Sequence, residues 1–166
     1  MSEAEFGAVF RRDGAFVTGV LTRTFDATAS DLWRVMIEPA SMATWLAPGR
    51  IETSVGGKAR LDFADSGAVI DSEVTAAEAG RLVEFSWSQP GEPLRPVRWE
   101  VAASGAGAVL TVTVKTPTPE DPGKACAGWE AHLAMLAAAL AGAPIGFPFE
   151  TFMAARAAYK PVVAAL

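Results

Sequence analysis

The order of patterns along the chain constrains the fold more than any single motif. A segment with two short helices runs from Asp31 to Gly49, a long helix runs from Ala127 to Gly142, and about six strand-like runs lie between them. Within each run apolar and polar residues alternate, which is typical of an antiparallel sheet with one buried and one solvated face. A meander that ends in a long helix allows a curved sheet to wrap that helix. The wrapped space is then either a filled core or a ligand cavity.

Two further strand-like runs precede the first helical segment. Asp13-Gly14 lies between them, and this pair of residues is a strong hairpin signal. Gly56-Gly57 marks another turn, inside the meander. The predicted strands cover residues 6–10, 16–25, 50–55, 58–63, 70–74, 83–87, 97–101 and 110–114.

The helix ends carry recognisable signals. Thr28 and Ser30 can each cap the first helix through a hydroxyl, with Asp31 in its first turn. Pro39 ends that helix, because the residue before a proline avoids the α region, and it suits the first turn of a second helix. Asp121-Pro122 fits the cap and first turn of the long helix, and Gly142 is typical of its end.

Composition limits the classes of partner. The chain has 14 basic and 19 acidic residues, so its net charge of −5 argues against binding to nucleic acid or to an anionic membrane. Cys126 is the only cysteine, which excludes an intrachain disulfide and favours a reducing compartment. Residues 1–5 are acidic where a signal peptide would be basic. The uncharged run over residues 131–149 is broken by Gly142 and Pro144, short of a membrane span. We expect a cytoplasmic protein of one domain.

The sequence indicates no metal site and no cofactor. One histidine and one cysteine cannot form a Cys/His zinc site, and HExxH, Walker, GxGxxG and GxSxG patterns are absent. No catalytic residue is assigned, but His132 is a candidate general base because it titrates near neutrality, one turn from Trp129 and Met135. The alternative is that His132 is a packed residue at the edge of the helix's apolar stripe.

Arg23 conflicts with its strand. It shares the parity of Leu21 and Phe25, so a regular strand would point it inward, where an unpaired charge is costly. Either a β-bulge turns it outward or it binds an anion inside the fold.

Large aromatic residues occupy the other inward positions. They either fill the core or line a pocket for an apolar or aromatic ligand, with methionines as adaptable walls. In the second case Met42 and Trp45 lie near the mouth, and His132 and Met135 lie on the helix. The predicted cavity residues are Met42, Trp45, Phe63, Phe85, Trp87, Trp99, His132, Met135 and Arg23.

An ordered set of short motifs resembles the SRPBCC (START-like, helix-grip) superfamily, and within it the group similar to the C-terminal domain of the heat-shock-protein-90 ATPase activator. The set spans residues 5 to 142. It consists of Arg23-Thr-Phe-Asp-Ala27, Leu32-Trp33-Arg34, Glu38-Pro39, Thr44-Trp45-Leu46-Ala-Pro-Gly49, Gly56-Gly57, Arg81-Leu-Val-Glu-Phe-Ser-Trp87, Gly128-Trp129, His132-Leu133 and Leu140-Ala-Gly142.

The resemblance implies an α+β helix-grip fold: a curved antiparallel sheet wrapped around a long C-terminal helix, with two short helices after the first long strand. It implies an elongated apolar cavity between sheet and helix. The helix-grip domain would cover residues 1–142. Residues 143–166 would form a tail whose short amphipathic helix stops before Pro161 and packs on the domain or on a partner subunit, so a homodimer is possible.

Three functions are compatible with such a chain, because a fold does not specify its chemistry. The first is the binding of a small hydrophobic or aromatic ligand in the cavity. The second is a cofactor-independent enzyme of cyclase, dehydratase or hydrolase type in which His132 moves a proton. The third is a protein-interaction domain, co-chaperone-like or self-associating, whose signature would be an exposed apolar patch around Ile145, Phe147, Phe149 and Phe152.

Overall fold

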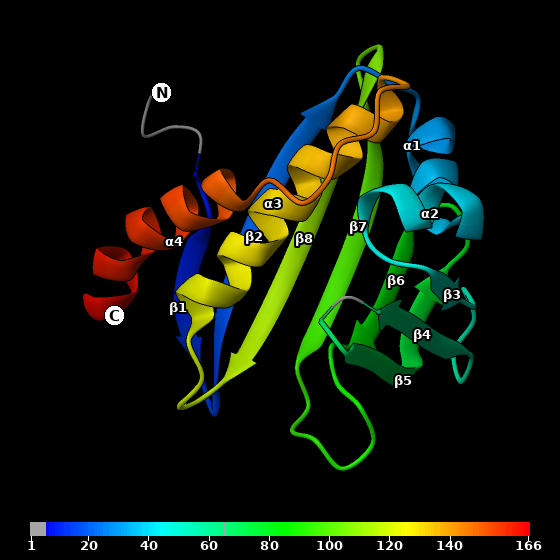
Figure 1. Cartoon of the computed structure of the whole chain (residues 1–166). Helices are drawn as coiled ribbons and strands as arrows, with labels where there is room; N and C mark the ends of the chain where they lie inside the picture. The colour runs from blue at the N-terminus through cyan, green and yellow to red at the C-terminus, as the bar shows by residue number, and fades with distance from the viewer. Residues whose placement is uncertain (1–5, 65) are drawn as a thin grey trace.

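One curved antiparallel sheet and the long helix α3 (Pro122–Leu140) that crosses it make up most of the structure (Figure 1). The computed structural model describes residues 6–64 and 66–166. The prediction that residues 1–5 are not a signal peptide therefore lies outside the described residues. Within this part of the chain the sheet has eight strands. They are β1 (Val9–Asp13), β2 (Phe16–Phe25), β3 (Gly49–Ile51), β4 (Lys58–Phe63), β5 (Ala68–Glu78), β6 (Leu82–Ser86), β7 (Pro96–Ser104) and β8 (Gly107–Pro117).

The strand order is β1-β2-β8-β7-β6-β5-β4-β3, and every pair is antiparallel. The first long strand β2 therefore lies beside the last strand β8, and the two pair from Phe16–Pro117 to Phe25–Ala108. This pairing brings the first long strand and the last strand together, and α3 contacts both. The predicted α+β fold, with a sheet around a long helix, is confirmed.

The predicted strands 16–25 and 58–63 have their observed bounds, β6 is shifted by one residue, and β5, β7 and β8 are longer than predicted. The other two strands differ for a local reason. The first lies at Val9–Asp13 instead of residues 6–10, because Asp13 pairs with Phe16 across a tight turn at Gly14 and Ala15. The third ends at Ile51 instead of residue 55, because the amide of Gly57 bonds back to the carbonyl of Ser54 and turns the chain.

Helices α1 (Ala29–Ile37) and α2 (Pro39–Trp45) follow β2 as predicted. The hydroxyl of Thr28 accepts a hydrogen bond from the amide of Asp31 at 3.0 Å, and Pro39 lies in the first turn of α2. At α3 the carboxylate of Asp121 accepts from the amide of Lys124 at 3.1 Å. The capping signals in the sequence thus lie at the real helix ends.

Helix α4 (Phe149–Ala164) packs on α3 near β1, and the segment that joins the two helices runs back along α3 (Figure 1). The prediction that this helix stops before Pro161 is wrong, because Pro161 lies inside it. The proline removes one helical hydrogen bond. Val163 beyond it packs against the core, and this contact favours continuing the helix. No described helix is both long and apolar enough to cross a membrane.

Helix α3 approaches the sheet closely at Gly19 in β2. A Cβ atom at this position would lie 2.5 Å from Sγ of Cys126 and 3.2 Å from the ring of Phe10. Both neighbours are buried, so neither can move freely into solvent. The glycine is therefore required by the distance between helix and strand.

We expect Gly19→Ala to lower the free energy of unfolding by about 1–3 kcal/mol, because overpacking a filled core costs about this much. The measurement is urea denaturation of both proteins. In a Cys126→Ala background the same substitution should cost less, since the obstructing sulfur is gone. An equal cost in both backgrounds would show that the contact with Cys126 is not the constraint.

Candidate functional site

The end of the gripped space under α1 and α2 is filled. Met42, Trp45, Phe85 and Trp99 are each fully buried, and the ring of Trp99 lies 5.4 Å from those of both Trp45 and Phe85. We expected these four residues on the walls and mouth of a cavity, but they line neither of the cavities described below. Helices α1 and α2 cover this end, so its aromatic side chains pack against one another.

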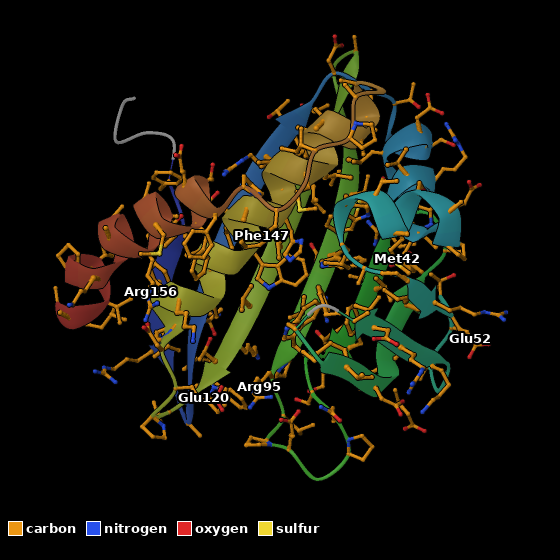
Figure 2. The ribbon with its side chains drawn as sticks, in the orientation of Figure 1. Met42, Glu52, Arg95, Glu120, Phe147 and Arg156 are labelled. Atoms are coloured by element: carbon orange, nitrogen blue, oxygen red, sulfur yellow. The ribbon has the colours of Figure 1, made fainter. Side chains whose placement is uncertain are left out.

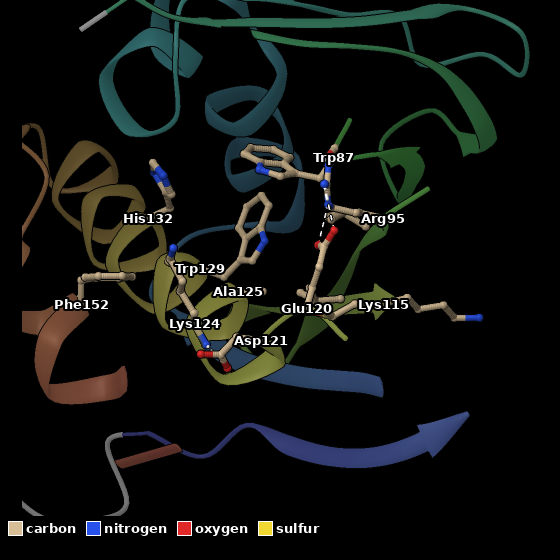
Figure 3. Close-up of a pocket in the computed structure, with 14 residues that line it drawn as sticks. Trp87, Arg95, Lys115, Glu120, Asp121, Lys124, Ala125, Trp129, His132 and Phe152 are labelled. Atoms are coloured by element: carbon tan, nitrogen blue, oxygen red, sulfur yellow. Dashed lines mark hydrogen bonds and ion pairs between the residues drawn. The ribbon is translucent and has the colours of Figure 1, made fainter. Parts of the chain in front are cut away.

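Two cavities open on the other side of α3. The first, of about 520 Å³, lies between α3 and strands β6 to β8. The second, of about 460 Å³, lies between α3, β4 and the loop after α2. Both are in the size range of small-molecule sites. His132 lines both of them, and Figure 3 shows its place among the residues of the first.

Aromatic rings surround His132. The ring centroid of His132 lies 6.0 Å from Phe63, 6.0 Å from Trp129 and 5.5 Å from Phe147. Trp87 in turn lies 4.9 Å from Trp129 and 5.7 Å from Phe63. The structure therefore brings together four of the predicted residues, namely Phe63, Trp87, His132 and Met135.

Most residues that line the cavities were not predicted as part of the site, and three of them are informative. Trp129 and Gly128 lie on α3, and Phe152 lies on α4. Gly128 could have been identified from the sequence, because a glycine inside a long helix lowers helix stability and therefore indicates a packing or functional role. Here a Cβ atom at Gly128 would meet nothing within 4 Å, so the glycine leaves space in the first cavity.

One nitrogen of His132 is held by the backbone. Nδ1 lies 2.9 Å from the carbonyl oxygen of Trp45, and a carbonyl can only accept, so Nδ1 carries the proton. Burial lowers the pKa of His132 below its usual value of 6.5, although the bond to Trp45 acts in the opposite direction. The ring is therefore neutral near pH 7, with its lone pair on Nε2. Among residues 6–64 and 66–166, no side chain or backbone group bonds to Nε2.

Charged residues lie at the far end of the first cavity. Arg95 donates to both carboxylate oxygens of Glu120, at 2.8 and 3.0 Å, as Figures 2 and 3 show. This pairing lowers the pKa of Glu120 and raises that of Arg95. Lys115, Asp121 and Lys124 complete this end. The cleft therefore has an aromatic part at His132 and a polar end.

Arg23 has a partner that the sequence did not indicate. Strand β2 pairs with β8 without a bulge, so Arg23 points inward as its parity requires. There it forms an ion pair with Glu130 of α3, whose side chain is fully buried. The expectation of a β-bulge that turns Arg23 outward is wrong, whereas Arg23 does bind an anion inside the fold, and this anion is a residue of the chain itself. Arg23 lines neither cavity.

Glu130 also fastens α4. Tyr159 donates its hydroxyl hydrogen to Glu130, and the same hydroxyl accepts from the amide of Ala8 at 3.1 Å. The carboxylate of Glu130 thus joins α3 to β2 and α4, and the hydroxyl of Tyr159 extends this connection to Ala8 in the N-terminal segment.

Cys126 and the acidic side chains add no nucleophile or metal site to the two cavities in the described part of the chain. Burial raises the pKa of Cys126 to about 12, so its thiol is not a nucleophile at neutral pH. Within the described part of the chain, no group of three or more His, Cys, Asp or Glu side chains is placed to hold a metal ion.

The chain is similar to one family and to several solved structures. A sequence profile described as "Activator of Hsp90 ATPase homolog 1-like protein" matches residues 26–141. CalU16 from Micromonospora echinospora is 18% identical, with a TM-score of 0.76 over 95% of this chain and 96% of that one. The conserved protein of unknown function EF2215 from Enterococcus faecalis is 17% identical, with a TM-score of 0.78 over 96% and 91%.

A third structure, of the protein encoded by BPP1335 from Bordetella parapertussis, is 24% identical, with a TM-score of 0.70 over 90% of this chain and 87% of that one. Identities of this size show the fold alone. No protein with a curated description matches the chain.

Because burial lowers its pKa, His132 should titrate below 6.5 in the folded protein. The unfolded chain takes up this proton near pH 6.5, while the folded chain takes it up only at lower pH. Stability should therefore fall as the pH drops below about 6.5, down to the folded pKa. His132 is the only histidine, so nitrogen-15 NMR of its ring in the folded and in the unfolded protein reports the two pKa values directly. Titration at or above 6.5, or a proton on Nε2 at pH 7, would contradict this.

We expect Tyr159→Phe to lower the free energy of unfolding by about 1–3 kcal/mol, because it removes a donor from a buried carboxylate. The phenylalanine keeps the ring contacts with Phe6 and Phe10, so lost packing does not contribute. Urea denaturation measures the effect. An unchanged midpoint would mean that the hydroxyl does not hold α4.

Proposed function

The chain belongs to the family of Activator of Hsp90 ATPase homolog 1-like proteins, and from this premise we propose that it binds a small hydrophobic or aromatic molecule at His132. One observation carries the proposal: a histidine that aromatic rings surround lines two cavities, of about 520 and 460 Å³. Their position between sheet and helix is where the helix-grip fold leaves space.

Apolar burial would supply most of the binding energy. A bicyclic aromatic molecule that buries about 200 Å² gains about 5 kcal/mol, before the cost of association. Trp87 and Trp129 offer ring faces and edges for such a molecule in the first cavity, and Phe63 and Phe147 do so near the second. The charged residues at the far end can orient a polar substituent.

An enzyme activity in the same cleft is the second candidate. The observation that favours it is the neutral His132, whose Nε2 can accept a proton from a bound substrate. The other ring nitrogen is held by a carbonyl instead of a carboxylate, so the imidazolium formed would have weak support. We therefore place binding ahead of catalysis.

The third hypothesis, a protein-interaction surface, has its own observation. Of the four residues predicted for this patch, Ile145, Phe147 and Phe149 are exposed, whereas Phe152 is partly buried against the core. Met153 of α4 is also exposed. Phe147, however, also contacts His132 and lines the second cavity, and it lies against α3 in Figure 2. We propose that the main role of Phe147 is to line the ligand site, and not to form a protein-interaction surface.

Gly128→Leu tests the proposal, because the new side chain fills the first cavity from a position with open space. We expect it to weaken binding of 2-methoxynaphthalene at least tenfold, measured from shifts of the tryptophan indole resonances. Thermal stability should not fall, since leucine favours a helix by up to about 1 kcal/mol over glycine.

Ala137→Leu is the matched control. Ala137 lies exposed on the same helix and lines neither cavity, so this variant should bind as the wild type does. Equal binding by both leucine variants would exclude the first cavity, and a wild-type protein that binds no aromatic probe would refute the proposed function.

A further inference from the structure

We propose that the site selects ligands that donate a hydrogen bond to Nε2 of His132, such as phenols and enols, over matching molecules that only accept. This inference rests on the proposed function and names the chemistry of the molecule bound there. It follows from the orientation of one ring and from what surrounds that ring.

A hydrogen bond to the backbone of Trp45 fixes the orientation of the His132 ring. Its Nδ1 donates to the carbonyl of Trp45 at 2.9 Å. Trp45 is itself immobile, because it is fully buried and its indole nitrogen donates to the carbonyl of Met36 at 3.3 Å. A flip of the imidazole would break the bond to Trp45, so the same nitrogen always faces the cavities.

The exposed nitrogen is an acceptor. Burial keeps the imidazole neutral by lowering the pKa of His132, and the single proton is already on Nδ1. Nε2 therefore carries a lone pair in a residue that lines both cavities, and among the described residues it is not one of the fully buried polar atoms without a partner. His132 thus has a fixed tautomer and a fixed ring orientation, whereas a surface histidine exchanges its tautomers and rotates freely.

The protein supplies no donor of its own at this point. Phe63, Met135 and Phe147 have no hydrogen-bond donor in their side chains, and no hydrogen bond joins Trp129 to the ring in the described part of the chain. A ligand that covers His132 without donating would remove water from Nε2 and leave it unpaired, which is costly. A ligand hydroxyl avoids this cost.

Anionic ligands do not fit the same position. A carboxylate only accepts, and its charge would be desolvated among aromatic rings. Lys124 lines the same cavity, so an anionic group of a ligand would pair with that lysine and not with the lone pair of Nε2. The chemistry at Nε2 therefore favours a neutral donor.

A pair of probes that differ by one methyl group tests the inference. We expect 2-naphthol to bind about two- to tenfold more tightly than 2-methoxynaphthalene, which is the ratio that one net hydrogen bond produces. Burial alone predicts the opposite order, because the ether is the more apolar molecule. The nitrogen-15 resonance of Nε2 should move with the naphthol and stay unchanged with the ether.

His132→Phe provides the second arm. It keeps a ring of similar size and removes the acceptor, so the preference for 2-naphthol should disappear while the ether still binds. If this variant fails to fold because the carbonyl of Trp45 loses its donor, the wild-type nitrogen-15 measurement decides alone.

The outcomes separate this inference from the proposed function. Equal binding of both probes overturns the hydrogen-bond requirement and leaves the ligand site intact. Tighter binding of 2-naphthol without a shift at Nε2 also overturns it, since the donor then bonds elsewhere. Failure of both probes to bind overturns the inference together with the proposed function.

Discussion

The packing of α3 against β2 is the contact on which the rest of the structure depends. It needs a residue without a side chain at Gly19, where a Cβ atom would lie 2.5 Å from the sulfur of Cys126. It is tied further along by the buried Glu130, which bonds to Arg23 of β2 and Tyr159 of α4. Because Glu130 and His132 are two residues apart, they leave the helix on roughly opposite sides. One side of α3 thus holds the fold and the other forms the site.

The gripped space divides into a filled part and an open part. Under α1 and α2, Trp45, Phe85 and Trp99 fill the space themselves. Further along α3, Ala43 of α2 and the loop after it border the second cavity, and the segment before α4 brings Phe147 against His132. The candidate site lies at the boundary between these parts, and the carbonyl of Trp45 reaches His132 from the filled side.

The sequence by itself determined the elements and most of their order. Alternating residues specify strands because successive side chains in a strand point to opposite faces, and this needs no knowledge of the partner strand. Thr28, Asp121 and Pro39 specify helix ends because capping acts within four residues. Local rules failed where a distant contact outweighed them, as at Pro161, where packing of Val163 favours continuing the helix.

Only the tertiary structure decided which inward residues face a cavity and which fill the core. Parity places Trp87 and Trp99 on the same face of the sheet, but it does not show that one is covered and the other lines a cavity. Likewise Arg23 and Glu130 are 107 residues apart, and no local pattern links them. The sequence indicated that His132 could titrate near neutrality. Its neutral state, its fixed tautomer and its open nitrogen come from burial and from a backbone carbonyl 87 residues away. The physical reason is that solvation and partner choice depend on what packs around a side chain, and only the folded chain specifies this.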